Sequence, residues 1–167
     1  MTIVAIIPAR GGSKGIERKN LLEVGVGTSR CSLVARSIRH AKRVAAIESV
    51  WVSTDDLEIM DIAAHEGAKV IKRPEELATD EASTDAALVH AIGKIRSSGR
   101  DPSIVVTLQP TTPFRQTHTI EDCIAACPSF TAYEQWQYDW TDGYPYTEGR
   151  LRRQERAPRI IEDGSVY

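Results

Sequence analysis

The sequence has no long apolar run and almost no net charge, and these two absences limit the partners that the protein can have. No stretch approaches the roughly 18 to 20 consecutive apolar residues that a membrane-spanning helix needs. The 21 basic and 23 acidic residues leave a net charge of −2, so no overall field attracts nucleic acid or an acidic membrane. We therefore expect neither as a partner, and any anion must be bound by a local group of residues.

Cysteine is also scarce, and its three positions form no paired pattern: Cys31, Cys123 and Cys127. The chain opens on a strand-like run rather than on a charged and then apolar leader, and we expect a cytoplasmic protein. Cys123 and Cys127 lie one helical turn apart and near His118, but no fourth ligand stands at zinc spacing. We interpret the pair as ordinary helix packing and assign no residue to a metal.

Strand-like and helix-like segments alternate along most of the chain. The expected strands are 3–7, 49–53, 68–71, 104–108, 129–132 and 161–167, and the expected helices are 32–44, 57–66, 84–97 and 117–126. This alternation predicts an α/β fold with a doubly wound, mostly parallel sheet and right-handed crossovers. The unbroken apolar run at 3–7 is typical of a strand buried on both faces of such a sheet. A chain of 167 residues is expected to form one domain, 1–167.

The most distinctive stretch, residues 8–20, directly follows the first expected strand. It carries three glycines and four cations, Arg10, Lys14, Arg18 and Lys19. Glycine lets backbone N–H groups turn around phosphate oxygens, while arginine and lysine neutralise the phosphate charge. The glycine spacing fits neither the dinucleotide fingerprint nor the P-loop. We predict a polyanion-binding loop of another type, suited to a triphosphate; the alternative is a solvated loop with incidental cations.

Two further polar motifs, 72–83 and 109–115, also follow expected strands. Ligands of open parallel sheets bind beyond the carboxyl ends of the strands. We therefore expect all three motifs to meet at one rim of the sheet. By contrast, we interpret the arginines and lysine of the helix 32–44 as a solvated face rather than as a binding patch; they are Arg36, Arg39, Lys42 and Arg43.

Residues 8–15, Pro-Ala-Arg-Gly-Gly-Ser-Lys-Gly, and the Arg-Lys-Asn at 18–20 resemble the signature loop of the acylneuraminate cytidylyltransferases. Two later stretches agree in the same order: Lys-Arg-Pro-Glu-Glu-Leu-Ala-Thr-Asp at 72–80 and Leu-Gln-Pro-Thr-Thr-Pro-Phe-Arg at 108–115. The resemblance implies a Rossmann-like fold of the nucleotide-diphospho-sugar transferase type. It also implies a nucleotidyltransferase that joins CTP to a nonulosonic, sialic-type acid, giving a CMP-sugar and pyrophosphate.

The resemblance implies roles for individual residues. Arg10 and Lys19 are the expected catalytic cations, because each would stabilise charge on the triphosphate in the transition state. Ser13 and Asn20 would hold phosphate and ribose oxygens, and the cytosine would face Arg73, Thr84 and the backbone at residues 9 and 10. The whole nucleotide set is Ala9, Arg10, Gly11, Ser13, Lys14, Lys19, Asn20, Arg73 and Thr84, with Arg73 as a plain surface cation the alternative. The sugar-binding set is Gln109, Thr111, Thr112 and Arg115, in which Arg115 either pairs with the sugar carboxylate or supports the loop.

Magnesium is also implied, but the resemblance offers no ligands for it in this sequence. The family holds its metal with an Asp-x-Asp pair after an Asn-Gly-x-x-Tyr strand, which residues 164–167 resemble, and the sequence stops at Tyr167. We therefore expect a chain truncated at its C-terminus. Asp55 and Asp56, the only adjacent aspartates, are explained as a turn and a helix cap. No lysine follows Lys94, so the lysine that the family places near its sugar site is missing or replaced by arginine.

Six of the ten aromatic residues lie within 133–146. Aromatic rings serve in sugar pockets and in interfaces, and they also pack as lids on sheet edges. The resemblance implies a dimerisation insertion here, so we expect a homodimer in which 133–159 is a lid or dimerisation insertion. Two alternatives to the assigned reaction remain open. One is a transferase that activates a different sugar acid or a sugar phosphate, and the other is a catalytically weak or inactive nucleotide-binding or dimerising partner.

Overall fold

The computed structural model describes residues 1–13, 15–127, 132–135, 159–162 and 166. Its strands are β1 (Ile3–Pro8), β2 (Glu23–Val24), β3 (Cys31–Ser32), β4 (Ser49–Thr54), β5 (Lys69–Lys72), β6 (Ile104–Thr107), β7 (Ala132–Gln135) and β8 (Arg159–Glu162). Its α-helices are α1 (Leu33–Lys42), α2 (Leu57–His65), α3 (Thr84–Ser97) and α4 (Thr117–Ala125). Short 3₁₀ helices are η1 (Lys19–Leu21), η2 (Gly27–Ser29) and η3 (Glu75–Leu77).

The main sheet has four parallel strands in the order β5-β4-β1-β6. β1 lies inside it and pairs with β4 from Val4 opposite Ser49 onward and with β6 from Ile3 opposite Ile104 onward. The segments that connect β1 to β4, β4 to β5 and β5 to β6 each contain an α-helix, α1, α2 and α3 respectively. The predicted α/β fold with a mostly parallel, doubly wound sheet is confirmed.

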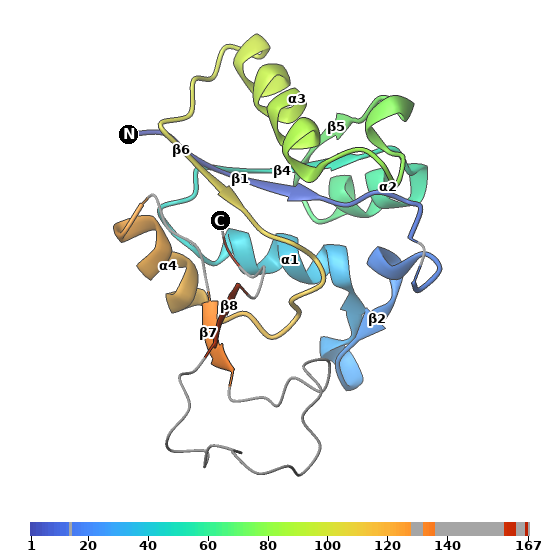
Figure 1. Ribbon diagram of the computed structural model, residues 1–167, viewed down its shortest axis with the longest axis horizontal. Helices are drawn as coiled ribbons and strands as arrows, with labels where there is room; N and C mark the ends of the chain where they lie inside the picture. Colours follow the sequence, from blue (N-terminus) through green and yellow to red (C-terminus); the bar gives the residue numbers. More distant parts are fainter. Residues whose placement is uncertain (14, 128–131, 136–158, 163–165, 167) are drawn as a thin grey trace, which may run out of the picture.

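Side chains of β1 alternate between two cores on the two faces of this sheet. Ile3, Ala5 and Ile7 pack on the face that is covered by α1, α2 and α4. Val4 and Ile6 pack on the opposite face against α3 (Figure 1). All five side chains are at most 5% exposed, which explains why the run contains no polar position.

Side-chain caps start the three helices that follow β3, β4 and η3. Ser32, Asp56 and Ser83 accept hydrogen bonds from the backbone N–H groups three residues ahead, at the beginning of α1, α2 and α3. The prediction that Asp56 caps a helix is confirmed. Helix α2 ends at His65, and Gly67 in the turn that follows has φ +70, a conformation that favours glycine.

The end of the chain pairs differently from the prediction. β8 runs antiparallel to β7 in a separate two-stranded ribbon, with Ala132 opposite Glu162 and Gln135 opposite Arg159. The expectation that 161–167 adds a strand to the main sheet is therefore wrong for the part that is described. An apolar pattern identifies an extended segment, but the choice of partner edge depends on contacts far away in the sequence. The strand expected at 129–132 begins at Ala132, and residues 128–131 lie outside the described part.

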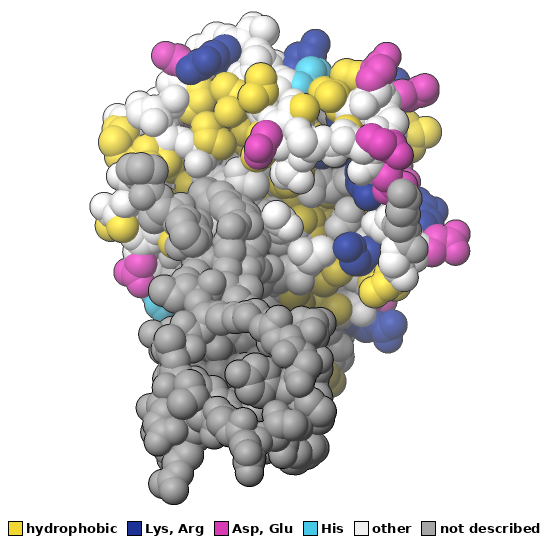
Figure 2. All heavy atoms as spheres, viewed as in Figure 1, with side chains coloured by type: hydrophobic (Ala, Val, Ile, Leu, Met, Phe, Trp, Pro, Cys, Tyr) yellow, Lys and Arg dark blue, Asp and Glu magenta, His cyan; other side chains and the backbone are white. Residues whose placement is uncertain are grey.

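Acidic and basic side chains are interspersed on the described part of the surface that Figure 2 shows, with apolar side chains between them. This mixture fits the small net charge. Among the described residues, none of the helices has the length and apolar character needed to cross a membrane.

Candidate functional site

A cavity of about 460 Å³ opens beyond the carboxyl ends of β1, β5 and β6. Residues from the three polar motifs line it: from 8–20 after β1, from 72–83 after β5 and from 109–115 after β6, together with Thr84 at the start of α3. The expected meeting of the three motifs at one rim is confirmed. The volume of this cavity lies within the range of small-molecule sites.

Eight of the residues predicted for the site line this cavity: Arg10, Ser13, Lys19, Asn20, Arg73, Thr84, Gln109 and Thr111. Four others are not among its lining residues: Ala9, Gly11, Thr112 and Arg115. Lys14 lies outside the described residues. The binding roles of the whole set remain predictions.

The charge around the cavity is mainly positive. Arg10, Lys19 and Arg73 line it, and Asp80 is the single carboxylate among the described lining residues. The ammonium group of Lys19 has no hydrogen bond or ion pair within the described part of the chain, and its side chain is half-buried. An anion in the cavity would therefore meet one cation that no protein group has neutralised.

Arg10 spans the cavity toward the second motif. Its Nη1 donates to the Thr79 carbonyl oxygen at 2.8 Å, and its Nη2 pairs with Asp80 Oδ1 at 2.7 Å. Sequence reasoning missed Asp80 as a site residue, although it stands inside the quoted motif 72–80. An anionic ligand would have to compete with this carboxylate for the Arg10 guanidinium.

Arg73 is a buried cation held by the end of β4. It is 6% exposed, and it donates from Nε to Ser53 Oγ at 3.2 Å and from Nη2 to the Ser53 carbonyl oxygen at 2.9 Å. Burial lowers the pKa of the Arg73 guanidinium, the nearby Asp55 carboxylate raises it and Arg10 lowers it. Because arginine stays protonated in proteins, Arg73 brings a fixed charge and fixed donors to the cavity wall. The alternative of a plain surface cation is therefore wrong.

Two other predicted residues support the loops that carry the cavity wall. Asn20 is 7% exposed, and its Nδ2 donates to the Arg10 carbonyl oxygen at 2.9 Å. Arg115 is 6% exposed, and its Nη2 donates to the Gln109 carbonyl oxygen at 2.8 Å. This contact agrees with the alternative in which Arg115 supports its loop.

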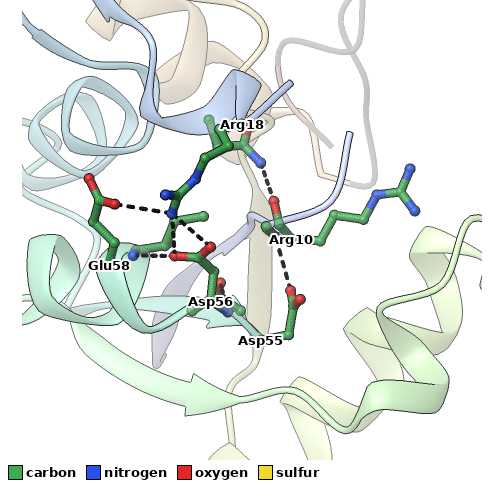
Figure 3. Close-up of polar contacts among 9 residues, drawn as sticks. Arg10, Arg18, Asp55, Asp56 and Glu58 are labelled. Carbon is green, nitrogen blue, oxygen red and sulfur yellow. Dashed lines mark hydrogen bonds and ion pairs between the residues drawn. The ribbon is translucent and has the colours of Figure 1, made fainter. Parts of the chain in front are cut away.

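Three acidic residues at the end of β4 and the start of α2 form a clamp that holds the loop 8–20 in place; they are Asp55, Asp56 and Glu58. Asp55 Oδ1 accepts a hydrogen bond from the Gly11 backbone N–H at 3.0 Å. Asp56 Oδ2 and Glu58 Oε2 each lie 3.0 Å from Arg18 Nη2. Figure 3 shows Arg18 pointing toward these two carboxylates while the Arg10 side chain extends in the opposite direction. The two arginines of the loop thus have different tasks, one anchoring the loop and one reaching the cavity.

Arg18 has an unusual backbone conformation. With φ 49 it lies in the left-handed region, the one described residue other than glycine to do so. A side chain there costs about 1 to 2 kcal/mol, which the ion pairs with α2 partly offset. The clamp therefore holds the loop in a turn that the residue would not adopt by preference.

No group of three or more His, Cys, Asp or Glu side chains in the described ranges is arranged to hold a metal ion. Asp55 is bonded to the Gly11 N–H, and Asp56 is bonded to Arg18 and to the first turn of α2. Among the described residues, these two aspartates are therefore already engaged in protein contacts, and none is assigned to the magnesium ion that the family resemblance implies.

Two substitutions at Asp56 distinguish the stabilisation due to the α2 cap from that due to the Arg18 ion pair. We expect Asp56→Ala to lower the free energy of unfolding by about 1 to 2 kcal/mol, because it removes both the α2 cap and the Arg18 ion pair. Asp56→Asn keeps a capping oxygen and should cost about 0.5 kcal/mol or less. Urea unfolding of both variants checks this, and equal losses would show that the ion pair, rather than the cap, carries the stabilisation.

Three comparisons with known proteins bear on the fold and the cavity. The model of the cytidylyltransferase family matches residues 4–137. The chain is 43% identical over 120 residues to an N-acylneuraminate cytidylyltransferase of Escherichia coli O18:K1:H7, an alignment that covers 71% of this chain and 27% of that protein. It is 36% identical to the CMP-N,N'-diacetyllegionaminic acid synthase of Legionella pneumophila, covering 74% of this chain and 52% of that protein.

A further relative is the N-acylneuraminate cytidylyltransferase A of Danio rerio, 31% identical over 99% of this chain and 40% of that protein. The chain thus spans between about a quarter and about a half of the length of these three relatives.

Solved structures share the fold at lower identity. The CMP:2-keto-3-deoxy-manno-octonic acid synthetase, solved in complex with CTP, superposes with a TM-score of 0.71 at 21% identity, covering 99% of this chain and 73% of that one. A 4-diphosphocytidyl-2C-methyl-D-erythritol synthase superposes with a TM-score of 0.59 at 12% identity, covering 98% and 75%. The family model covers residues 4–137, and an acylneuraminate-type relative aligns over 99% of the chain. The chain therefore belongs to the cytidylyltransferase family, as the resemblance of residues 8–20 predicts.

Proposed function

We propose that the cavity binds CTP, and that the protein transfers its cytidylyl group to a nonulosonic acid to give a CMP-sugar and pyrophosphate. The observation that carries the proposal is the convergence of Arg10, Lys19 and Arg73 on one cavity at the carboxyl edge of the sheet. Membership of the cytidylyltransferase family supports it, as do relatives named for N-acylneuraminate and N,N'-diacetyllegionaminic acid.

In the proposed reaction, the anomeric hydroxyl oxygen of the sugar acid forms a bond to the α-phosphorus of CTP. The bond from that phosphorus to the oxygen bridging it to the β-phosphorus breaks, pyrophosphate leaves and the hydroxyl proton is released. Negative charge grows on the leaving group, so cations fixed beside it lower the barrier. Arg10 and Lys19 are the proposed cations, with Lys14 a further phosphate contact and Ser13 a hydroxyl donor.

The second motif is proposed to recognise the base. Cytosine presents an amine donor at C4 and an acceptor at N3. Arg73 offers a donor on a guanidinium fixed by Ser53, and Thr84 and Arg10 line the same cavity. The backbone at Ala9, also proposed for this wall, is not among the lining residues, and its N–H donates to the Ser53 carbonyl oxygen. A buried and immobile donor suits the N3 acceptor of cytosine and would oppose the N3–H of uracil.

CTP is therefore expected to bind more tightly than UTP, by about tenfold or more, because a buried polar group left unpaired costs about 1 to 3 kcal/mol. Titration calorimetry with the two nucleotides under the same conditions checks this. Equal affinities would mean that the cavity recognises only the phosphates.

The third motif is proposed to bind the sugar acid. Gln109 and Thr111 line the cavity, whereas Arg115 holds the Gln109 carbonyl oxygen from outside it. We therefore propose direct sugar contacts for Gln109 and Thr111 and a supporting role for Arg115. Thr112 is proposed to belong to the same loop without a contact to the cavity.

The proposed assembly is a homodimer in the cytoplasm, with residues 133–159 as a lid or dimerisation insertion of a single domain. The proposal rests on the family resemblance and on the concentration of aromatic residues in 133–146. Most of this segment lies outside the described residues. Sedimentation of the purified chain would contradict the proposal if it showed only a monomer at micromolar concentration.

Pyrophosphate release tests the reaction directly. The purified chain is mixed with CTP, MgCl₂ and one acid at a time: N-acetylneuraminic, N,N'-diacetyllegionaminic or pseudaminic acid. Release with one of the three supports the proposal and names the acid. CTP binding with no release would favour the catalytically inactive partner, and failure to bind CTP would overturn the proposal.

A further inference from the structure

A second cavity, of about 370 Å³, lies beside α1 and shares no described lining residue with the first. One wall comes from α1 and its C-terminal residue, and the other comes from η2. The polar side chains that line it include Arg36, Arg39, His40, Arg43 and Thr28. No acidic residue is among its described lining residues.

Two of its arginines keep their charge unneutralised. Arg39 is paired with both carboxylate oxygens of Glu66, so its charge is balanced. Arg36 donates from Nε to the Pro113 carbonyl oxygen at 2.6 Å, which is a neutral partner. The Arg43 side chain has no hydrogen bond or ion pair within the described part of the chain. Arg36 and Arg43 stand seven positions apart, about two helical turns, and so project from the same side of the helix.

His40 lies between these arginines in the sequence and is 7% exposed. Its Nδ1 atom is buried and has no hydrogen-bond partner among the described residues. Buried polar side-chain atoms are normally paired, and this unpaired one lies behind the cavity surface rather than on it. Burial, together with the positive charges of Arg115, Arg36 and Arg43, lowers the pKa of His40 to about 4. The imidazole is thus neutral at pH 7 and faces a positive environment.

We propose that this cavity is a second anion site, which binds a phosphate group, free or as a phosphomonoester, between Arg36 and Arg43. Guanidinium groups present parallel donors that match phosphate oxygens. The Thr28 hydroxyl is a further donor to a phosphate oxygen. Of the four residues expected to form a solvated face, Arg39, Lys42 and Arg43 are exposed, as expected, and only Arg36 is half-buried. The proposal takes up the other interpretation, that part of this face is a binding patch.

Orthophosphate is the probe for this site. Thermal unfolding and calorimetry are followed as phosphate is added to the 167-residue chain, with sodium chloride at matched ionic strength as the reference. We expect a saturable rise in the unfolding temperature and a phosphate affinity that falls at least tenfold in Arg43→Gln. Arg43 is exposed, so this variant should fold; Arg36→Gln with Arg43→Gln is the stronger test. Ribose 5-phosphate replaces orthophosphate in a second series, which distinguishes an ester from the free ion.

Two controls separate this site from general charge effects and from the first cavity. Lys94→Gln removes an exposed cation of α3 and should leave phosphate binding unchanged. Lys19→Ala removes a cation of the first cavity, where orthophosphate also has positive charge to meet, so the arginine variants are titrated both in the parent chain and in this background. The phosphate response that remains in Lys19→Ala and is lost with the arginines belongs to the second site, so the result does not depend on the proposed CTP reaction. Histidine NMR gives a second readout: phosphate should raise the pKa of His40, because its charge offsets that of Arg36, Arg43 and Arg115.

The proposal is overturned if phosphate binding is absent or follows ionic strength alone, or if it persists unchanged in the double variant. It is also overturned if the double variant changes sedimentation but not phosphate affinity. That outcome would assign the basic face to contacts between copies of the chain.

Discussion

Replacing Lys19 or Arg10 with alanine is expected to weaken CTP binding by roughly 10- to 150-fold and to remove most turnover. Each change deletes a charge-assisted contact with the triphosphate, worth about 1.5 to 3 kcal/mol. The loss should be larger for Lys19, because its ammonium group has no ion pair among the described residues. Arg10 must first leave Asp80, so part of its interaction with CTP is offset.

Calorimetric titration with CTP measures both variants, and Lys94→Ala serves as the charge-matched control on α3. Thermal unfolding of each variant shows whether the fold is intact. Unchanged CTP affinity in both Lys19→Ala and Arg10→Ala would remove the first loop from the nucleotide site, whatever the family of the protein.

Gly11→Ala is expected to disrupt the same loop without removing any charge. A Cβ atom at Gly11 would lie 2.7 Å from Asp56 Oδ2 and 2.8 Å from Asp56 Cβ, closer than real contacts allow. Asp56 cannot move freely, since it caps α2 and holds Arg18. We expect a loss of about 1 to 3 kcal/mol in the free energy of unfolding, as for overpacking elsewhere, together with weaker CTP binding.

Gly12→Ala is the matched control, because a Cβ atom at Gly12 would have nothing within 4 Å. Its free energy of unfolding should stay within about 0.5 kcal/mol of the parent. Urea unfolding and CTP titration of the two variants test the difference. Equal behaviour would mean that the loop shifts away from Asp56 at little cost and that the clamp is not needed to shape it.

Much of the fold was predictable because its signals are local. The apolar run at 3–7, the helical periods and the capping residue Asp56 are each specified by neighbours within one or two turns. The rim that carries the cavity also followed from topology, since parallel strands bring their carboxyl ends to one edge. Arg10, Arg73 and Gln109 lie far apart in the sequence and yet line one cavity.

The remaining features depend on long-range partners that periodicity does not encode. The pairing of β8 with β7 is one example, and the ion pair between Arg10 and Asp80 is another. A helical pattern places Arg36 on a polar face, but only the packed structure shows that the Pro113 carbonyl oxygen partly covers it.

The position of β1 between β4 and β6 also affects how the protein folds during synthesis. Ile3 pairs with Ile104, so β1 receives one of its two neighbours only about 100 residues later in the chain. Contacts this distant in sequence slow folding, and domains of this size begin to form during synthesis. β4 and β5 can join β1 before β6 exists, which leaves the apolar β1 edge without a partner. A nascent chain that pauses before residue 104 would therefore carry Arg10 and Arg73 but lack Gln109 and the rest of that cavity wall. It would also expose an aggregation-prone strand edge on β1 until β6 pairs with it.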